Sequence, residues 1–478
     1  MKKVLVVAAL IGTAASAQAA DLARKAPILK APPMVVYNWT GFYIGVNGGV
    51  SVARDRTSTL TSLPSAEQTV VSPFGAIGGG QIGYNWQVNN DWLIGVESDI
   101  QASGETTNRT CLLSCTAALS ENISQKIDWF GTTRARVGLV DGPVLSYITG
   151  GVAYGHYSTT VNESGNLGVV GAPVATLANV TTGRTGVGFT YGSGVEASLG
   201  GNWTGKIEYL YVDLGTRNTL FASAAAAGPQ TLTTRIHDNI FRAGVNYRFG
   251  GNGLTVTPPT ANWAGFYLGL NAGSLTGRNP SAWGAGGTVE QFHLVPDGYA
   301  GGAQAGYNWQ AGSWVFGLEA DFQGGFSEDK DACINGCAAF PVSLKQTLPW
   351  YGTARGRLGY SLGSTLFYGT GGFAYGSTHT RFTEFGAAGA ATINLNHSRG
   401  GWTAGAGIES PLKFFGLFGP NWTAKTEYLY VDLGRTSDVF APFGGAQTFT
   451  TRTQEHIFRS GINYHFNALE PTAVSARY

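Results

Sequence analysis

Charged residues are scarce in this chain, at 12% of 478 residues, or about half the share of roughly 25% in typical soluble domains. Lysine and arginine nearly balance aspartate and glutamate, and the formal net charge of +1 gives no electrostatic reason to expect nucleic acid as a partner. No segment beyond the N-terminus approaches the roughly 20 apolar residues that a membrane-spanning helix needs. If the chain resides in a membrane, we therefore expect it to cross as β-strands.

Cysteine is also rare, and its four residues form two C-x3-C pairs: Cys111 with Cys115, and Cys333 with Cys337. The N-terminus has the basic start, short apolar run and Ala-Gln-Ala site of a signal peptide, predicted over residues 1–19. Export to an oxidising compartment favours two local disulfides over a metal site. The seven histidines show no ligand spacing, so we expect no metal and no cofactor.

What the chain has instead is glycine, 71 residues of it, and a long internal repeat. Residues 240–249 return almost unchanged at 457–466, and 38–47 return at 262–271. A period above 200 residues is too long for a solenoid and indicates a duplicated domain. The predicted parts are a Pro-rich lead-in and two copies joined by a Gly- and Pro-rich linker, followed by a tail: 20–37, 38–249, 250–261, 262–466 and 467–478.

Each copy contains eight segments in which apolar and polar residues alternate, the period expected of β-strands. In the first copy, short turns alternate with long polar loops, predicted over 51–75, 103–125, 157–185 and 214–237. This asymmetry is typical of outer-membrane barrels. We therefore predict an all-β fold of two tandem, eight-stranded, antiparallel transmembrane barrels. The alternative is one sixteen-stranded barrel that conducts solutes as a porin.

The apolar face of these strands is predicted to meet lipid; in the fourth segment it includes Ile127, Trp129 and Val137, alternating with Asp128 and Arg134. Charges on the opposite face nearly balance in sign, which suggests that they pair inside a narrow or plugged lumen. Such a network is a better interpretation of Glu97 and Asp99 than a catalytic pair, and we expect no enzymatic activity. The predicted network comprises Glu97, Asp99, Arg134, Arg136, Glu196, Lys206, Glu208, Arg242 and Arg248 in the first copy, and Glu319, Asp321, Arg355, Arg357, Glu409, Lys425, Glu427 and Arg459 in the second, where His465 replaces one arginine.

Several motifs together resemble a known family: the opening Asn-Trp-Thr-Gly-Phe-Tyr-Ile-Gly at 38–45, the Tyr-Leu-Tyr-Val-Asp-Leu-Gly block at 209–215, and the Phe-terminated last strand at 240–249. They look like the small outer-membrane surface-antigen barrels of alphaproteobacteria, similar to the OmpA membrane domain. Two departures stand out: family members usually have one barrel, and they end at the last aromatic residue, whereas here residues 467–478 follow Phe466.

The resemblance implies a Gram-negative outer-membrane location, contact with outer-membrane lipid and insertion by the barrel-assembly machinery. It also implies a structural or surface-antigen role in the cell envelope, in which the long loops could contact a host or envelope partner. Some family members are porin-like channels, and others are adhesins or bind haemin. These remain alternative functions for this chain.

Overall fold

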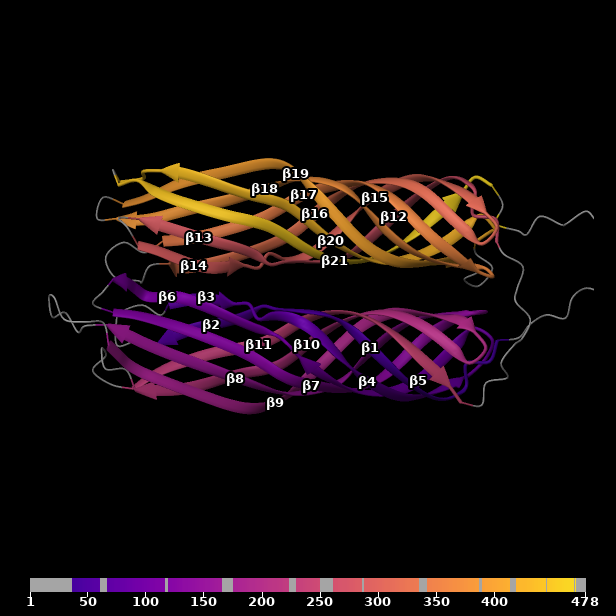
Figure 1. Ribbon diagram of the computed structural model, residues 1–478, viewed down its shortest axis with the longest axis horizontal. Coiled ribbons are helices and arrows are strands. Elements are labelled where there is room, and N and C mark those ends of the chain that lie inside the picture. The colour runs from indigo at the N-terminus through magenta and orange to yellow at the C-terminus, as the bar shows by residue number, and fades with distance from the viewer. Residues whose placement is uncertain are drawn as a thin grey trace, which may run out of the picture. The chain divides into compact units, whose positions relative to one another are not determined.

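The computed structural model describes residues 37–60, 67–116, 119–165, 175–222, 229–249, 261–285, 288–334, 342–386, 389–412, 418–443, 445–467 and 469. These residues form two closed rings of antiparallel strands, one after the other in the chain (Figure 1). None of them forms a helix long and apolar enough to cross a membrane. The predicted signal peptide, nearly all of the lead-in and the linker, and most of the tail lie outside the described residues.

The first ring closes between its first and last long strands, where Val46 of β1 is the partner of Val245 of β11. Each of its other strands pairs with the next in chain order. The eight strands are β1 Gly41–Ala53, β4 Phe74–Gln87, β5 Trp92–Ser103, β7 Leu119–Asp141, β8 Val144–Gly165, β9 Ala175–Gly200, β10 Trp203–Ala222 and β11 Pro229–Arg248.

The second ring closes in the same way, with Leu270 of β12 opposite Ile462 of β21. Because each copy closes on itself, the fold is two eight-stranded barrels, and the sixteen-stranded alternative is wrong. The strands of the second ring are β12 Gly265–Gly277, β15 Asp297–Ala311, β16 Trp314–Ile334, β17 Val342–Leu362, β18 Thr365–Gly386, β19 Gly389–Pro411, β20 Trp422–Phe440 and β21 Gln447–His465.

Five shorter strands lie at the long-loop end of the rings: β2 Asp55–Leu60, β3 Glu67–Val71, β6 Thr106–Thr116, β13 Asn279–Ala285 and β14 Thr288–Leu294. Three of them, β3, β6 and β14, take part in residue pairs between the two rings. Ala332 of β16 pairs with Gln68 of β3, and Gln291 of β14 pairs with Thr110 of β6. Both rings belong to one compact unit, Tyr37–Tyr478, and these single-residue bridges join their sheets.

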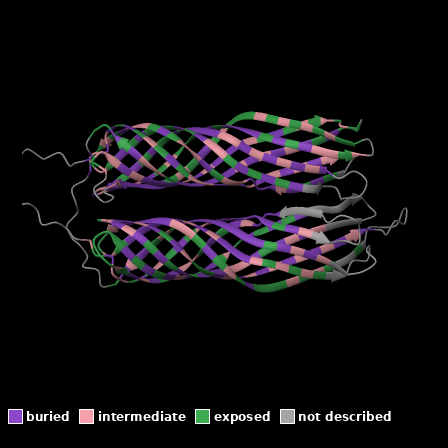
Figure 2. Ribbon diagram, turned by 180° about the vertical axis from the view of Figure 1, so that it is seen from behind, coloured by how far each residue is buried: buried purple, intermediate pink, exposed green. Residues whose placement is uncertain are grey.

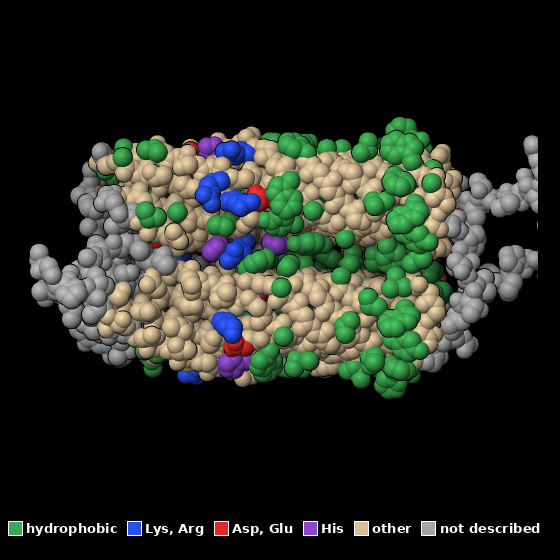
Figure 3. Space-filling model, in the orientation of Figure 1, with side chains coloured by type: hydrophobic (Ala, Val, Ile, Leu, Met, Phe, Trp, Pro, Cys, Tyr) green, Lys and Arg blue, Asp and Glu red, His purple; other side chains and the backbone are tan. Residues whose placement is uncertain are grey.

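A belt of outward-facing apolar side chains lies over the short-turn half of each barrel, as seen on the face drawn in Figure 3. It includes Phe42, Ile100 and Ile148 in the first barrel and Phe266 and Leu318 in the second, each more than half exposed. Side chains along these strands alternate between buried and exposed (Figure 2). Apolar outside and polar inside is the pattern of a transmembrane barrel. From the strand bounds and this belt we assign the membrane-spanning segments of the first barrel to 42–52, 74–86, 92–102, 129–141, 144–154, 187–200, 203–211 and 241–249.

Beyond the belt the strands continue where loops were predicted, and this part of the prediction is wrong. Strand β9 has 26 residues, whereas a membrane-crossing strand needs about 9 to 11. In this region the alternation is inverted: Ser124 and Thr160 face outward, and Ile123 and Val161 are buried. At these positions the extensions follow the soluble pattern, with polar residues outside and apolar residues inside, and buried polar side chains such as Gln125 lie among the apolar ones. Their Ser- and Thr-rich composition made them look like loops.

A β-bulge in β7 corrects the predicted face of Ile127. The register shifts between Ile127 and Trp129, so residues on either side of the bulge exchange faces. Ile127 is fully buried inside the barrel, while Asp128 faces outward and bonds His156. Trp129 and Val137 do face outward, as predicted.

The cysteines fall outside what the structure describes in detail. Cys111 and Cys115 lie in β6 and Cys333 lies in β16, but their side chains are not among the described ones. Cys337 lies outside the described residues altogether. The two local disulfides stay predictions.

Candidate functional site

Four acids and four bases meet inside the first barrel, on β5, β7, β9, β10 and β11. Arg134 is the central cation, and its guanidinium lies 2.5 Å from Glu97, 3.0 Å from Asp99 and 3.0 Å from Glu208. Arg242 bonds Asp99 at 2.8 Å and Glu208 at 2.6 Å. The remaining pairs are Lys206 with Glu97 at 2.8 Å and Arg136 with Glu196 at 3.2 Å. All eight side chains are at most 2% exposed.

The second barrel repeats this network almost contact for contact. Arg355 pairs with Glu319, with Asp321 at 3.1 Å and with Glu427 at 3.3 Å. Arg459 bonds Asp321 at 2.8 Å and Glu427 at 2.7 Å. Lys425 and Arg357 complete the set, contacting Glu319 at 2.9 Å and Glu409 at 2.7 Å, respectively. Each barrel thus brings together equal numbers of opposite charges.

Arg248, predicted as a ninth member of the first network, is placed elsewhere. Its guanidinium carbon lies 4.9 Å from the centre of the Trp39 ring, and it donates to the Asn38 carbonyl. It makes no ion pair with any of the described carboxylates. Its counterpart His465 does reach the network, with Nε2 3.2 Å from Glu409. The extra positive charge counted from the sequence is therefore not part of the first barrel's paired set.

Sequence reasoning missed a set of neutral residues that complete the network. Tyr43 and Tyr147 donate hydrogen bonds to Glu97 and Glu208, both at 2.9 Å. An amide chain from Asn47 through Gln81 and Asn246 ends on Glu196. The signal was available, because both copies carry the same residues at these inward positions; the second set is Tyr267, Tyr368, Asn271, Gln304 and Asn463.

Glycine is required directly opposite these tyrosines on the neighbouring strand, where each ring lies against the inner surface of the barrel. A Cβ atom on Gly194 would lie 2.6 Å from Tyr147 Oη, and one on Gly83 would overlap Tyr43 Oη. The second barrel repeats both contacts, at Gly407 and Gly306. Part of the high glycine content therefore makes room for buried aromatic rings.

Inward positions above the first network include the apolar residues Leu210, Leu214 and Ile240. Beyond the belt, the buried residues of the first barrel include several carboxyls, among them Asp55, Glu105 and Asp238. Burial raises the pKa of Asp238 to about 7. Burial, and then the charge of Asp238, also hold the pKa values of Asp55 and Glu105 well above their ordinary range. The described residues contain no cluster of three side chains that could hold a metal ion.

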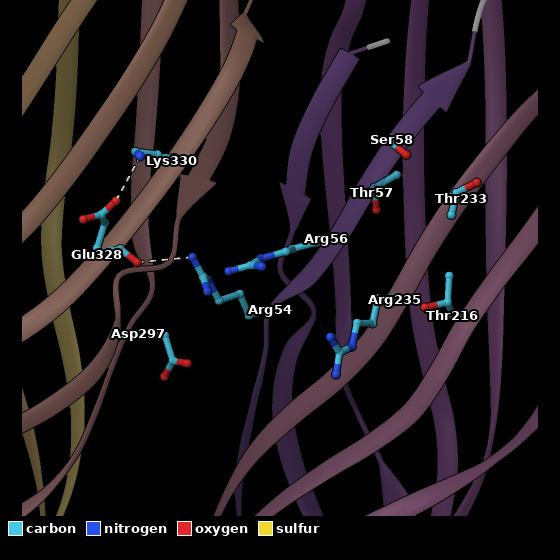
Figure 4. A pocket seen from close by; sticks show the side chains of 10 residues that line it. All are labelled: Arg54, Arg56, Thr57, Ser58, Thr216, Thr233, Arg235, Asp297, Glu328 and Lys330. Atoms are coloured by element: carbon cyan, nitrogen blue, oxygen red, sulfur yellow. Dashed lines mark hydrogen bonds and ion pairs between the residues drawn. The ribbon is translucent and has the colours of Figure 1, made fainter.

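On the outer surface, a groove of about 680 Å³ lies where the two barrels approach each other above the belt (Figure 4). Arg54 reaches from the first barrel to Asp329 at 2.6 Å and to the backbone oxygen of Glu328 at 3.2 Å. Four cations and two acids line the groove, together with small hydroxyl side chains; the charged residues are Arg54, Arg56, Arg235, Lys330, Asp297 and Glu328.

An apolar outer belt, a hydrogen-bonded ring without free edges and a charged interior define an integral outer-membrane β-barrel protein. Sequence comparison reaches the same class. The chain belongs to the "Outer membrane protein beta-barrel domain" family, whose profile matches it twice, at residues 5–249 and 253–466. The resemblance to alphaproteobacterial surface antigens and the Gram-negative outer-membrane location are thereby confirmed.

The relatives are proteins of single-barrel size. The 31 kDa outer-membrane immunogenic protein of Brucella melitensis is 35% identical over 257 residues, which is 52% of this chain and all of that protein. The 22 kDa outer membrane protein of Rhizobium leguminosarum is 32% identical, over 36% of this chain and 66% of that one. Among solved structures, Neisserial surface protein A is 15% identical and covers 44% of this chain and 98% of its own, with a TM-score of 0.20.

Proposed function

We propose that the protein is a non-conducting pair of barrels with a structural and surface-antigen role in the outer membrane. The observation that carries this proposal is the charge network, in which four acids and four bases pair in each barrel with almost no exposure. An eight-stranded barrel is just wide enough for side chains to fill it. Solvent-filled pores need a free path, and this network occupies the middle of the path.

The same geometry argues against catalysis. Each carboxylate of the network already bonds a cation, so none is free to act as a general base at a substrate. The relatives are also outer-membrane proteins by name. We propose that the chain is not an enzyme and that the barrel-assembly machinery inserts it.

Single-channel recording tests the closed lumen. Purified full-length protein in planar bilayers should give no stable conductance steps, because the paired charges fill both lumens. The double variant Arg134→Ala/Arg355→Ala removes the central cation of both networks. It should give conductance steps that the wild-type protein lacks. Large, regular steps from the wild-type protein would refute the closed-lumen proposal and favour a porin-like role.

A surface-binding role is the second candidate. The extracellular extensions present strands longer than the membrane requires, and strand β9 alone has 26 residues. A rigid sheet standing above the bilayer suits contact with a host or envelope partner. Such a role is compatible with a closed lumen, whereas a porin-like role is not. Deletion of the strand extensions beyond the belt should abolish binding of the partner at the cell surface. The shortened protein should still fold and insert into the outer membrane.

A further inference from the structure

Three cations lie next to one another on the outward face of the second barrel. Lys330 on β16 is the direct cross-strand partner of Lys345 on β17, and Lys345 is the partner of Arg381 on β18. Neighbouring strands lie about 4.8 Å apart, so three positive charges fall within about 10 Å. Like charges directly opposite each other destabilise a sheet. An anion bound to this cation row would remove that repulsion.

Among the residues that the structure describes, one carboxylate is paired with the cation row. Glu328 lies 2.6 Å from Lys345 and 3.3 Å from Lys330. Arg381 contacts no carboxylate within the described part of the chain, and its Nε donates to the Asn394 side chain at 3.3 Å. The row therefore keeps two uncompensated positive charges on an exposed surface.

The position of the row selects the kind of anion. Phe326 on β16 is 81% exposed, and Lys330 is the second outward residue beyond it. On β17 the sequence of outward residues is Trp350, Thr347 and Lys345. Charged side chains gather at this edge of the hydrophobic belt (Figure 3). A ligand that fits both the hydrophobic belt and the cation row has acyl chains against the belt and an anionic headgroup at the row.

The first barrel shows that the fold does not need these charges. Its residues at the same register are Asn108, Ser124 and Thr160, which are also direct cross-strand partners. Thr160 bonds the hydroxyl of Thr181 across the next strand at 2.9 Å. Two copies with one architecture thus differ in this outward row, which is neutral in one copy and basic in the other.

We propose that Lys330, Lys345 and Arg381 bind the phosphate groups of an outer-leaflet glycolipid, the lipid A part of lipopolysaccharide. Arg381 can hold a phosphate in bidentate fashion, and the two lysines act as adjustable point charges. The row ends at the groove of Figure 4, which Lys330 lines together with Arg56 and Arg235 of the first barrel. The groove offers room for the sugar part of the headgroup.

Native mass spectrometry of the full chain in neutral detergent, titrated with lipid A that carries two phosphates, tests this site. The variant K330N/K345S/R381T gives the second barrel the first barrel's own residues. A basic residue near an anionic lipid surface contributes about 1 kcal/mol, or roughly fivefold, so the variant should bind about 100-fold more weakly. Lys126→Ser serves as the matched control, because Lys126 is already paired with Asp128 at 2.7 Å, and it should change binding less than twofold.

Two further measurements separate the lipid from its phosphate. Lipid A stripped of both phosphates should bind the wild-type protein and the triple variant equally, and inorganic phosphate should not displace the intact lipid. Lys345→Ser alone, expected to weaken binding about fivefold, replaces the triple variant if that variant does not fold. Equal lipid A binding by the wild type and the folded variant would overturn the proposal, as would full displacement by inorganic phosphate.

Discussion

Removing one cation from the middle of a barrel would measure how strongly the charge network holds it. Arg134→Met keeps much of the apolar stem and removes the guanidinium that contacts three carboxylates, at 2.5, 3.0 and 3.0 Å. Glu97, Asp99 and Glu208 keep other partners, Lys206 and Arg242. The variant barrel would hold four buried acids against three bases.

The expected loss follows from the uncompensated charge. Breaking a buried ion pair by deleting one partner costs about 3 to 5 kcal/mol, because the other charge stays buried without full compensation. The three contacts share their carboxylates with other cations, so their energies do not add up independently. We therefore expect a total loss of about 3 to 5 kcal/mol and not three times that amount.

Urea unfolding of the full-length protein in lipid vesicles, followed by tryptophan fluorescence, gives the free energy of unfolding. The control is Arg248→Met, which removes a buried arginine that stacks on Trp39 and makes no ion pair with the described residues. That loss should be about 1 to 2 kcal/mol. Arg355→Met should reproduce the Arg134→Met loss in the second barrel. If Arg134→Met cost no more than Arg248→Met, the network would not be a stabilising element, and the reasoning from buried charge would be refuted.

Three other changes test the remaining features. Gly194→Ala places a methyl group against Tyr147 and should cost about 1 to 3 kcal/mol in the same assay, whereas Gly80→Ala, with its nearest neighbour at 3.7 Å, should stay within about 0.5 kcal/mol. Val245→Arg puts a charge on the lipid face and should cost about 2 to 4 kcal/mol near mid-bilayer; a neutral result would mean that the faces are inverted. Asp238 has its folded-state pKa raised to about 7, so its contribution to stability is full below the unfolded pKa near 4 and is lost as the pH rises through about 7. Asp238→Asn should reduce that decline between about pH 4 and pH 7, and an unchanged slope would contradict the assignment.

The sequence predicted the features that its duplication repeats. Period-two alternation and the matching of residues 240–249 with 457–466 led to two barrels, and the repeated acids and bases turned out to face each other. Both depend on side-chain direction, which a strand pattern encodes directly. Tyr43 and Tyr147 escaped notice because a tyrosine fits the lipid face as well as the interior.

Two errors have a common physical cause. The strand extensions beyond the belt were predicted as loops, and Ile127 was assigned to the lipid face. In both cases the pattern of apolar residues outside and polar residues inside was assumed along the whole strand. The pattern inverts where the surroundings change from lipid to water, because the outer face then carries polar residues. In β7 the faces also exchange at the bulge beside Asp128. A single sequence contains both patterns but does not mark where the bilayer ends.

The bridges between β3 and β16 and between β14 and β6 bear on how the protein assembles. Above the belt, β3 and β6 lie at edges of the first sheet, and unpaired edges invite association with other chains. Each bridge is a single residue pair, so the second copy covers one point of each edge. Each copy closes its own barrel, and the relatives are of single-barrel size. We therefore expect that the two copies, made from separate genes, would each fold as a barrel and would associate through the edges of β3 and β6.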